Sequence, residues 1–360
     1  MDLARKCIRE STPYVAGKPI EETKRELGLK GEIVKLASNE NPLGCSPKAL
    51  RAIRKAAAGV NIYPDSNSFA LKRALAKDTG LEPGNIVVGN GSDELIDIII
   101  KSFLEPDENI VTSEGTFVEY EIICKVYGRT VKKAPLKDFR YDLNALRALV
   151  DAKTKLIFIA NPNNPTGTYV NRQELAAFIA GLPDTVITVV DEAYDTFINT
   201  ADYPFAKEYV GKKNVLVLKT FSKAYGLAGL RIGYCLAGAP FAACMEKARQ
   251  PFNVSLLAQE AALAALGDQA FLRKTRMTVL EGKRWLYGEF TKLGLTYVPS
   301  ETNFILVDVK RDCAKLFQDM LRLGVIVRDM KAYKLDTYIR VTVGTPRENK
   351  KFISALKKVL

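Results

Sequence analysis

The strongest limit on the fold of this chain is a series of short apolar runs that alternate with helix-length segments between residues 85 and 245. The last two runs are the most continuous and the richest in β-branched residues. Such runs between helices indicate a parallel sheet that is buried on both faces and has right-handed crossovers. The runs are NIVVGN (85–90), ENIVTS (108–113), KLIFIAN (155–161), TVITVVDEAY (185–194) and NVLVLKTFSK (214–223).

The C-terminal third has a different pattern. A long helical stretch at about 254–293 precedes three strand-like runs, TNFILVDV, LRLGVIVRDM and YIRVTVGTP. Strands and helices in this mixture are typical of an α+β unit. We therefore expect two domains. The large α/β domain would span residues 41–245, with a mostly parallel sheet flanked by helices, and the smaller α+β domain would join residues 1–40, including an N-terminal arm, to residues 246–360.

The composition excludes several kinds of site. The chain has no histidine, so histidine-based triads and metal sites are excluded, and proton transfer must use Lys, Tyr, Asp, Glu, Cys or a cofactor. Its six cysteines form no CxxC pair, which argues against a disulfide framework or a clustered zinc site and favours a cytoplasmic location. We expect no bound metal.

Charge and hydropathy also narrow the possible partners. No window approaches the ~18 apolar residues of a membrane helix, and the first residues lack the apolar core of a secretory signal. The net charge of +12 is spread over lysines that are interleaved with acids, without a long basic run. We therefore expect neither nucleic acid nor a membrane as a partner, and consider a small anionic ligand instead.

Polar groups follow three of the apolar runs. They are the turn NPNNPTG (161–167), Asp191 with Tyr194, and Lys223. Because ligands collect at the carboxyl ends of parallel strands, these groups are expected to converge. Each also has a simpler interpretation: the turn is only a turn, Asp191 caps a helix, and Lys223 extends into solvent.

Together these groups suit a cofactor with an aromatic nitrogen, an aldehyde and a phosphate. A lysine among small apolar residues can act as an amine nucleophile, and a carboxylate at a buried strand end can hold a protonated pyridine. The glycine turn GNGSDE (89–94) opens a helix whose free N–H groups suit a phosphate. Its spacing is not that of a dinucleotide-binding fingerprint.

Over nearly its whole length the chain resembles the fold-type I pyridoxal-phosphate aminotransferases of class I/II. The resemblance rests on NPNNPTG, DEAY and SKAYGLAGLRIG in this order. Within that family it is most similar to the histidinol-phosphate aminotransferases, through TPYVAGKP, LASNENPLG, YPD and VIVRDM…YIRVTVGTPREN. The resemblance implies a cytoplasmic homodimer that uses pyridoxal 5'-phosphate, with sites at the subunit interface.

The resemblance also assigns roles residue by residue. Lys223 would bind the cofactor covalently and then move the proton, Asp191 would pair with the ring nitrogen, and Tyr194 with Asn164 would bind the ring hydroxyl oxygen. Phe117 occupies the ring-stacking position, where relatives usually have a hydroxylated aromatic, so that hydroxyl contact is lost. Tyr63 would reach the phosphate of the partner subunit's site. The remaining phosphate residues would be Gly91, Ser92, Asp93, Ser222 and Arg231.

The implied reaction transfers an amino group between L-histidinol phosphate and 2-oxoglutarate, as a step of histidine biosynthesis. Substrate binding is assigned to Tyr14, Asn39, Arg328 and Arg340, with Arg340 on the α-carboxylate of glutamate. Three alternatives remain open. An aromatic-amino-acid aminotransferase would share the cofactor residues, a threonine-phosphate decarboxylase would share the lysine and the phosphate site, and a metabolite-binding α/β module would use no such cofactor.

Overall fold

The computed structural model describes residues 3–11, 13, 20–21, 25, 28 and 31–360. Its larger sheet has seven strands in the order β2-β10-β9-β8-β7-β3-β4, and every neighbouring pair is parallel except those that β10 makes with β2 and β9. The five predicted runs all form strands of this sheet, which confirms the α/β class. The strands are β2 (Ile86–Gly89), β3 (Asn109–Ser113), β4 (Thr130–Ala134), β7 (Thr154–Ala160), β8 (Ile187–Asp191), β9 (Val215–Thr220) and β10 (Gly233–Leu236).

The sheet is buried because helices cover it. Every residue of β2, β3, β8 and β10 is buried, so neither face of these strands needs to be polar and most of their residues are apolar. α5 packs against β2, β9 and β10 and also contacts α6 and α9, whereas α7 packs on β3, β4 and α8. The bounds are α5 (Gly91–Phe103), α6 (Glu119–Val126), α7 (Leu143–Ala148), α8 (Arg172–Ala180) and α9 (Ala239–Ala248).

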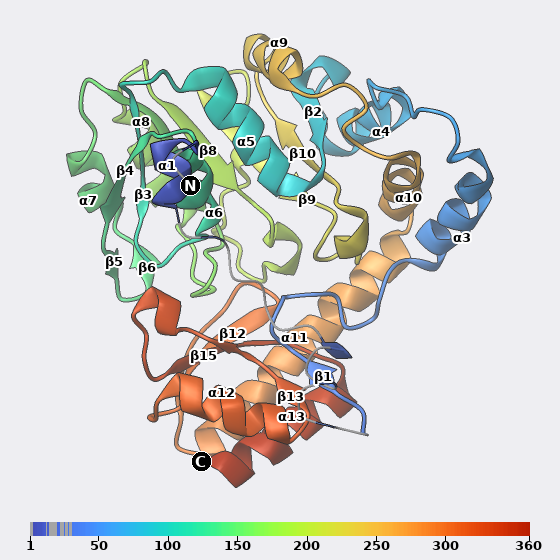
Figure 1. Ribbon diagram of the computed structural model, residues 1–360, viewed down its shortest axis with the longest axis vertical. Coiled ribbons are helices and arrows are strands. Elements are labelled where there is room, and N and C mark those ends of the chain that lie inside the picture. Colours follow the sequence, from blue (N-terminus) through green and yellow to red (C-terminus); the bar gives the residue numbers. More distant parts are fainter. Residues whose placement is uncertain (1–2, 12, 14–19, 22–24, 26–27, 29–30) are drawn as a thin grey trace.

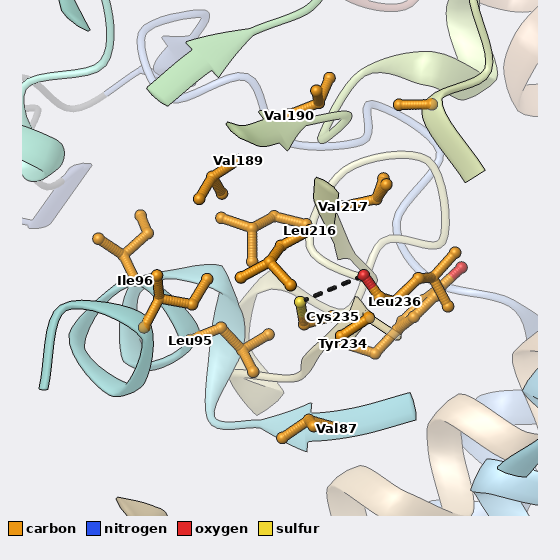
Figure 2. Close-up of a cluster of buried hydrophobic side chains, with 14 of the residues drawn as sticks. Val87, Leu95, Ile96, Val189, Val190, Leu216, Val217, Tyr234, Cys235 and Leu236 are labelled. Atoms are coloured by element: carbon orange, nitrogen blue, oxygen red, sulfur yellow. Dashed lines mark hydrogen bonds between the residues drawn. The ribbon is translucent and has the colours of Figure 1, made fainter. Parts of the chain in front are cut away.

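Figure 2 shows part of this core, where Leu95 of α5 faces Leu216 of β9 and Cys235 of β10. A fully buried aliphatic side chain of this kind contributes about 2 kcal/mol to folding. The Cys235 thiol donates to the carbonyl of Leu236 at 3.6 Å, and its burial raises its pKa to about 12. This cysteine therefore acts as a core residue rather than a reactive one.

Three further helices complete the large-sheet half at the right of Figure 1. α10 packs on α3 and α4, and its buried residues belong to the same hydrophobic core as the large sheet. The two-domain division stays a prediction, and this packing favours placing its boundary after Leu266 rather than at residue 245. The helices are α3 (Pro47–Ala56), α4 (Phe69–Thr79) and α10 (Leu256–Leu266).

The small-sheet half lies below it in Figure 1, and the long helix α11 runs between the two. Its antiparallel sheet has the order β11-β12-β15-β14, and the short strand β1 of the N-terminal segment pairs in parallel with β13. The bounds are β1 (Val34–Lys35), α11 (Gln269–Lys292), β11 (Thr296–Val298), β12 (Phe304–Asp308), α12 (Cys313–Arg322), β13 (Val325–Ile326), β14 (Arg328–Asp329), β15 (Tyr338–Thr342) and α13 (Pro346–Val359). The remaining elements are α1 (Lys6–Arg9), the hairpin β5 (Leu136–Lys137) and β6 (Arg140–Tyr141), and the 3-10 turns Ala57–Gly59, Pro83–Asn85, Asp195–Phe197, Ala206–Tyr209, Ala228–Leu230 and Lys331–Tyr333.

The two halves meet directly where the turn after β7 contacts the segment before β12. Gly167 has φ +79°, and a Cβ at this position would lie 2.3 Å from the Ser300 Oγ. The Glu301 amide donates to the Gly167 carbonyl at 2.8 Å. Glycine is thus required both by the backbone conformation and by the close approach.

Candidate active site

A cavity of about 260 Å³ lies between the two halves, at the carboxyl ends of β7, β8 and β9. Most of the predicted site residues line it, although they come from segments far apart in the sequence. Gly91 adjoins this set beside Arg231, and Tyr14 lies outside the described residues. The predicted residues that line the cavity are Asn39, Ser92, Asp93, Phe117, Asn164, Asp191, Tyr194, Ser222, Lys223, Arg231, Arg328 and Arg340.

Lys223 lies three residues beyond the end of β9, in a turn that small residues make possible. Its Nζ donates to the Ser38 carbonyl at 3.4 Å and lies 5.8 Å from the centre of the Tyr194 ring. Gly226 has φ +71°, and a Cβ there would lie 2.0 Å from the carbonyl oxygen of Gly44. The turn is therefore pressed against the N-terminal segment, so Lys223 lines the cavity instead of extending into solvent.

Asp191 ends β8 with both carboxylate oxygens held. Its Oδ2 accepts from the Tyr120 hydroxyl at 2.7 Å and its Oδ1 accepts from the Ala193 amide at 3.1 Å. Burial raises the pKa of Asp191 to about 6, and the hydrogen bond from Tyr120 is the largest influence in the opposite direction. The 3-10 turn that follows has Tyr194 as its N-cap, so Asp191 is not the helix cap of the simpler interpretation.

Tyr194 and Asn164 each connect to the small-sheet half. The side-chain NH₂ of Asn39 donates to the Tyr194 hydroxyl at 3.0 Å, and the Asn39 backbone has φ +56°. The Arg340 guanidinium donates to the Asn164 side-chain carbonyl through Nη1 and to the Ala37 carbonyl through Nη2 at 2.8 Å. Since the Asn164 carbonyl accepts this bond, its NH₂ group is the part left to donate to a ligand.

The two arginines of the small sheet are direct cross-strand partners, because Arg328 of β14 pairs in register with Arg340 of β15. Side chains of directly paired residues project from the same face of a sheet, so both guanidinium groups border one part of the cavity. The Arg340 guanidinium also lies 5.2 Å from the centre of the Phe304 ring.

The other end of the cavity is built on the N-terminus of α5. Arg231 donates to the Asp93 carboxylate at 2.8 Å and to the Ser222 hydroxyl at 3.4 Å. Arg231 has φ +53°, a conformation that is costly for a residue with a side chain. Gly91 has φ +84°, and a Cβ there would lie 2.6 Å from the Arg231 Nη2. Only glycine lets this guanidinium approach the helix N-terminus.

Sequence reasoning missed several residues that belong to this region, and three of them are Thr220, Glu119 and Tyr120. Thr220 and Glu119 line the cavity, and Tyr120 supports Asp191 from behind. Tyr120 follows Phe117 by three residues in a helix-like pattern, a spacing that brings side chains to one face, and this signal could have found it. Glu119 is half-buried, and burial together with the neighbouring Asp93 raises its pKa.

Three predictions concern features away from the cavity. Tyr63 does not line it: its side chain is 79% exposed and stacks on Phe252 with ring centres 4.7 Å apart. Among the described residues, no cluster of three or more Cys, Asp or Glu side chains is arranged to bind a metal ion. Across the same residues, each helix is too short or too polar to span a bilayer.

Comparisons with known proteins agree with this geometry. A family model described as aminotransferase class I and II matches residues 31–356. The histidinol-phosphate aminotransferase of Moorella thermoacetica is 47% identical over 99% of this chain and 92% of its own length. That of Akkermansia muciniphila is 48% identical over 99% of this chain and 98% of its own length.

Solved structures give the same result. The histidinol-phosphate aminotransferase of Sinorhizobium meliloti, in complex with pyridoxal-5'-phosphate, matches with a TM-score of 0.91 at 31% identity, over 100% of this chain and 98% of that one. The aspartate aminotransferase of Thermus thermophilus with maleate matches with a TM-score of 0.85 at 20% identity, over 100% of both chains, and shows the fold alone. The predicted fold type and family are confirmed: the chain belongs to the class I and II aminotransferases, in the branch of the histidinol-phosphate aminotransferases.

Proposed function

We propose that this protein uses pyridoxal 5'-phosphate to transfer an amino group between L-histidinol phosphate and 2-oxoglutarate, giving imidazole-acetol phosphate and glutamate. The observation that carries the proposal is that a single cavity holds Lys223, Asp191 and a register-paired couple of arginines. The first two suit the cofactor, and the arginines suit an anionic substrate. The relatives at 47% and 48% identity carry the same activity in their names.

The donor groups of the cavity fit the phosphate of this cofactor. The free N–H groups at the start of α5 and the Ser222 hydroxyl can donate to phosphate oxygens, and Arg231 supplies positive charge. The glycine at position 91 leaves open the space in which helix and guanidinium meet. Asp93 would contribute its backbone N–H, since its carboxylate already holds Arg231.

The residues at the strand ends fit the ring. Asp191 can accept a hydrogen bond from a protonated ring nitrogen, Phe117 can stack on the ring, and Tyr194 with Asn164 can contact the ring hydroxyl oxygen. When bound, pyridoxal 5'-phosphate supplies an aldehyde that takes up the amino group and a ring that stabilises negative charge on the reacting carbon.

Lys223 is the residue suited to move the proton. Its Nζ lies in the cavity near Asp191 and the Tyr194 ring, and Lys223 itself lies in the turn past the end of β9. A chain without histidine needs such an amine, because few other side chains can both take and return a proton at carbon. Lys223 would also bind the cofactor aldehyde covalently between turnovers.

The substrate anions would use the small sheet. Arg340 can bind the α-carboxylate of glutamate through a bidentate contact, and the phosphate of histidinol phosphate would use the same region with Arg328. Asn39 borders this region, and Tyr14 would add a contact from the N-terminal segment. One cationic region would thus serve both halves of the reaction.

We further infer a homodimer in which Tyr63 reaches the phosphate of the other subunit's site. The support is its exposure beside other exposed apolar residues, Val60, Ile62 and Phe69. Mixing the inactive Lys223→Ala and Tyr63→Ala proteins should give hybrid dimers with one working site. Continued inactivity after confirmed subunit exchange would contradict the shared site.

The deciding experiment compares amino donors. Cofactor-loaded protein is mixed with histidinol phosphate, phenylalanine, glutamate or phosphothreonine, and the loss of the cofactor absorbance band is followed. We expect histidinol phosphate to give the highest kcat/KM of these amines. A preference for phenylalanine would indicate the aromatic aminotransferase, and CO₂ release without 2-oxoglutarate would indicate the decarboxylase.

A further inference from the structure

We propose that Tyr120 is a positioning residue of this reaction, which holds the Asp191 carboxylate toward the ring nitrogen and, with the same side chain, sets the orientation of Phe117. The inference rests on the proposed function only in that it requires the cofactor ring to lie between Asp191 and Phe117. It does not depend on which amine is the substrate.

The hydroxyl of Tyr120 fixes the carboxylate. Tyr120 is fully buried, and its hydroxyl donates to the Asp191 Oδ2 at 2.7 Å. The other oxygen accepts from the Ala193 amide, so the two hydrogen bonds determine the plane of the carboxylate. Without the hydroxyl, only the backbone contact would restrain the Asp191 side chain.

The ring of Tyr120 is itself held and in turn holds Phe117. It stacks on Phe158 of β7 with ring centres 4.9 Å apart and planes 19° apart. It meets Phe117 edge-on, at 5.6 Å and 84°. Such aromatic pairs contribute beyond their buried area and fix ring angles. Since Phe117 lines the cavity, one side chain connects groups expected on two sides of the cofactor ring.

The same hydrogen bond influences the charge of Asp191. Burial raises the pKa of its carboxyl, and the groups that lower it are, in order, the Tyr120 hydroxyl, the Ala193 amide and the Lys223 ammonium, while Asp93 of α5 acts in the opposite direction. The hydroxyls of Tyr141, Tyr194 and Tyr203 also interact electrostatically with this carboxyl. Burial raises the pKa of Tyr120 well above its ordinary value, so its hydroxyl remains a donor at any working pH.

The chain offers a matched control for this hydrogen bond. Tyr127, at the C-terminal end of α6, donates to the Asp97 Oδ1 at 2.8 Å and does not line the cavity. Tyr127→Phe therefore removes the same kind of tyrosine–aspartate contact from the same helix without touching Asp191. Thermal unfolding of both phenylalanine variants establishes that each is folded.

The experiment measures cofactor affinity and the pH dependence of turnover. Tyr120→Phe should raise the dissociation constant of pyridoxal 5'-phosphate, measured by equilibrium dialysis, about tenfold. It should also lower kcat about tenfold, with KM nearly unchanged. The acid limb of its kcat profile should move to higher pH, because a carboxyl without this donor has a higher pKa. Tyr127→Phe should change none of these quantities.

A double-mutant cycle decides whether the effect acts through Asp191. In the Asp191→Asn background, Tyr120→Phe should cost less than about threefold in kcat, since the carboxylate that it holds is gone. A full tenfold loss in that background, or an unshifted acid limb, would overturn the proposal and leave Tyr120 as a core residue. If wild type fails to convert histidinol phosphate, the proposed function fails, but the dialysis and the cycle can be run with glutamate as the amine.

Discussion

The two halves of the cavity wall are built in different ways. In the large-sheet half, Asp191 is the last residue of β8 and Lys223 lies in a turn beyond β9, so these groups project from strand ends. In the small-sheet half, Arg328 and Arg340 lie within paired antiparallel strands, where register fixes their separation. Groups at strand ends can approach a ligand from its edge, whereas groups on a sheet face offer a rigid surface of fixed charge spacing.

This difference suggests a division of labour. The strand-end residues would carry the chemistry that every amino donor needs, and the arginine pair would select among donors. Substitutions in the large-sheet half should therefore affect all substrates alike, and substitutions of the arginine pair should affect substrates unequally.

The largest effect is expected for Lys223→Ala. The variant should remain folded, because the Lys223 side chain lines a cavity. Turnover should be lost with every amine, and borohydride treatment of the wild type should label Lys223. A label on another lysine would move the chemistry away from the end of β9.

The next effect is expected for Asp191→Asn. Replacing a buried carboxylate that faces a protonated ring should raise the activation barrier by about 3 kcal/mol, roughly 100-fold in kcat. Asp191→Glu keeps the charge and should cost less. The loss should be the same for glutamate and histidinol phosphate. Near-normal activity of the Asn variant would reduce Asp191 to a structural residue.

A smaller and selective effect is expected for Arg328→Gln. Removing one partner of a partly buried ionic contact costs about 2 kcal/mol, so kcat/KM for histidinol phosphate should fall roughly 30-fold. Phenylalanine, which has no phosphate, should be affected far less. Arg322→Gln, on the exposed side of α12, serves as the control. Equal losses for both amines would end the division of labour proposed above.

The smallest effect concerns Lys283 of α11, which does not line the cavity. Burial lowers the pKa of Lys283 to about 8, although its Nζ donates to the Ser300 carbonyl at 2.6 Å. The unfolded chain then binds more protons than the folded one above pH 8, so stability rises with pH until the unfolded value near 10.5. Between pH 8 and 9 the gain should be about 1 kcal/mol.

Denaturant unfolding at both pH values checks this prediction. The gain should be absent in Lys283→Met and retained in Lys292→Met, which alters an exposed lysine of the same helix. Neither variant should change the ratio of kcat/KM between amines. A changed ratio for Lys283→Met would show that α11 contributes to substrate selection.

The sequence predicted the parts of the fold and site that depend on local pattern. Continuous apolar runs predicted the parallel strands, and polar groups at their ends predicted the cavity wall around Asp191 and Lys223. The strand-like runs LRLGVIVRDM and YIRVTVGTP contain Arg328 and Arg340, and the structure pairs these two residues directly.

Other features of the fold and site depend on tertiary packing, and the sequence pattern indicates them only weakly. β10 is as buried as the parallel strands β3 and β8 of the same sheet, so its burial does not reveal that it runs antiparallel to β2 and β9. α10 follows a predicted domain boundary but packs on α3, because both bury apolar faces against the same core. The contact of Tyr120 with Asp191 joins residues 71 positions apart, so the spacing from Phe117 could indicate Tyr120 but not its partner.

The close approach of Gly167 to Ser300 has a consequence for recombination between relatives. The two residues belong to different halves, yet the Ser300 side chain fills the space that a side chain at position 167 would need. A chimera that takes its large-sheet half from one parent and its small-sheet half from another inherits this contact from both parents at once. A chimera with its crossover between α10 and α11 should therefore fold only when the second parent supplies a small residue at the position of Ser300. The pair Gly167 and Ser300 thus determines which parents are compatible.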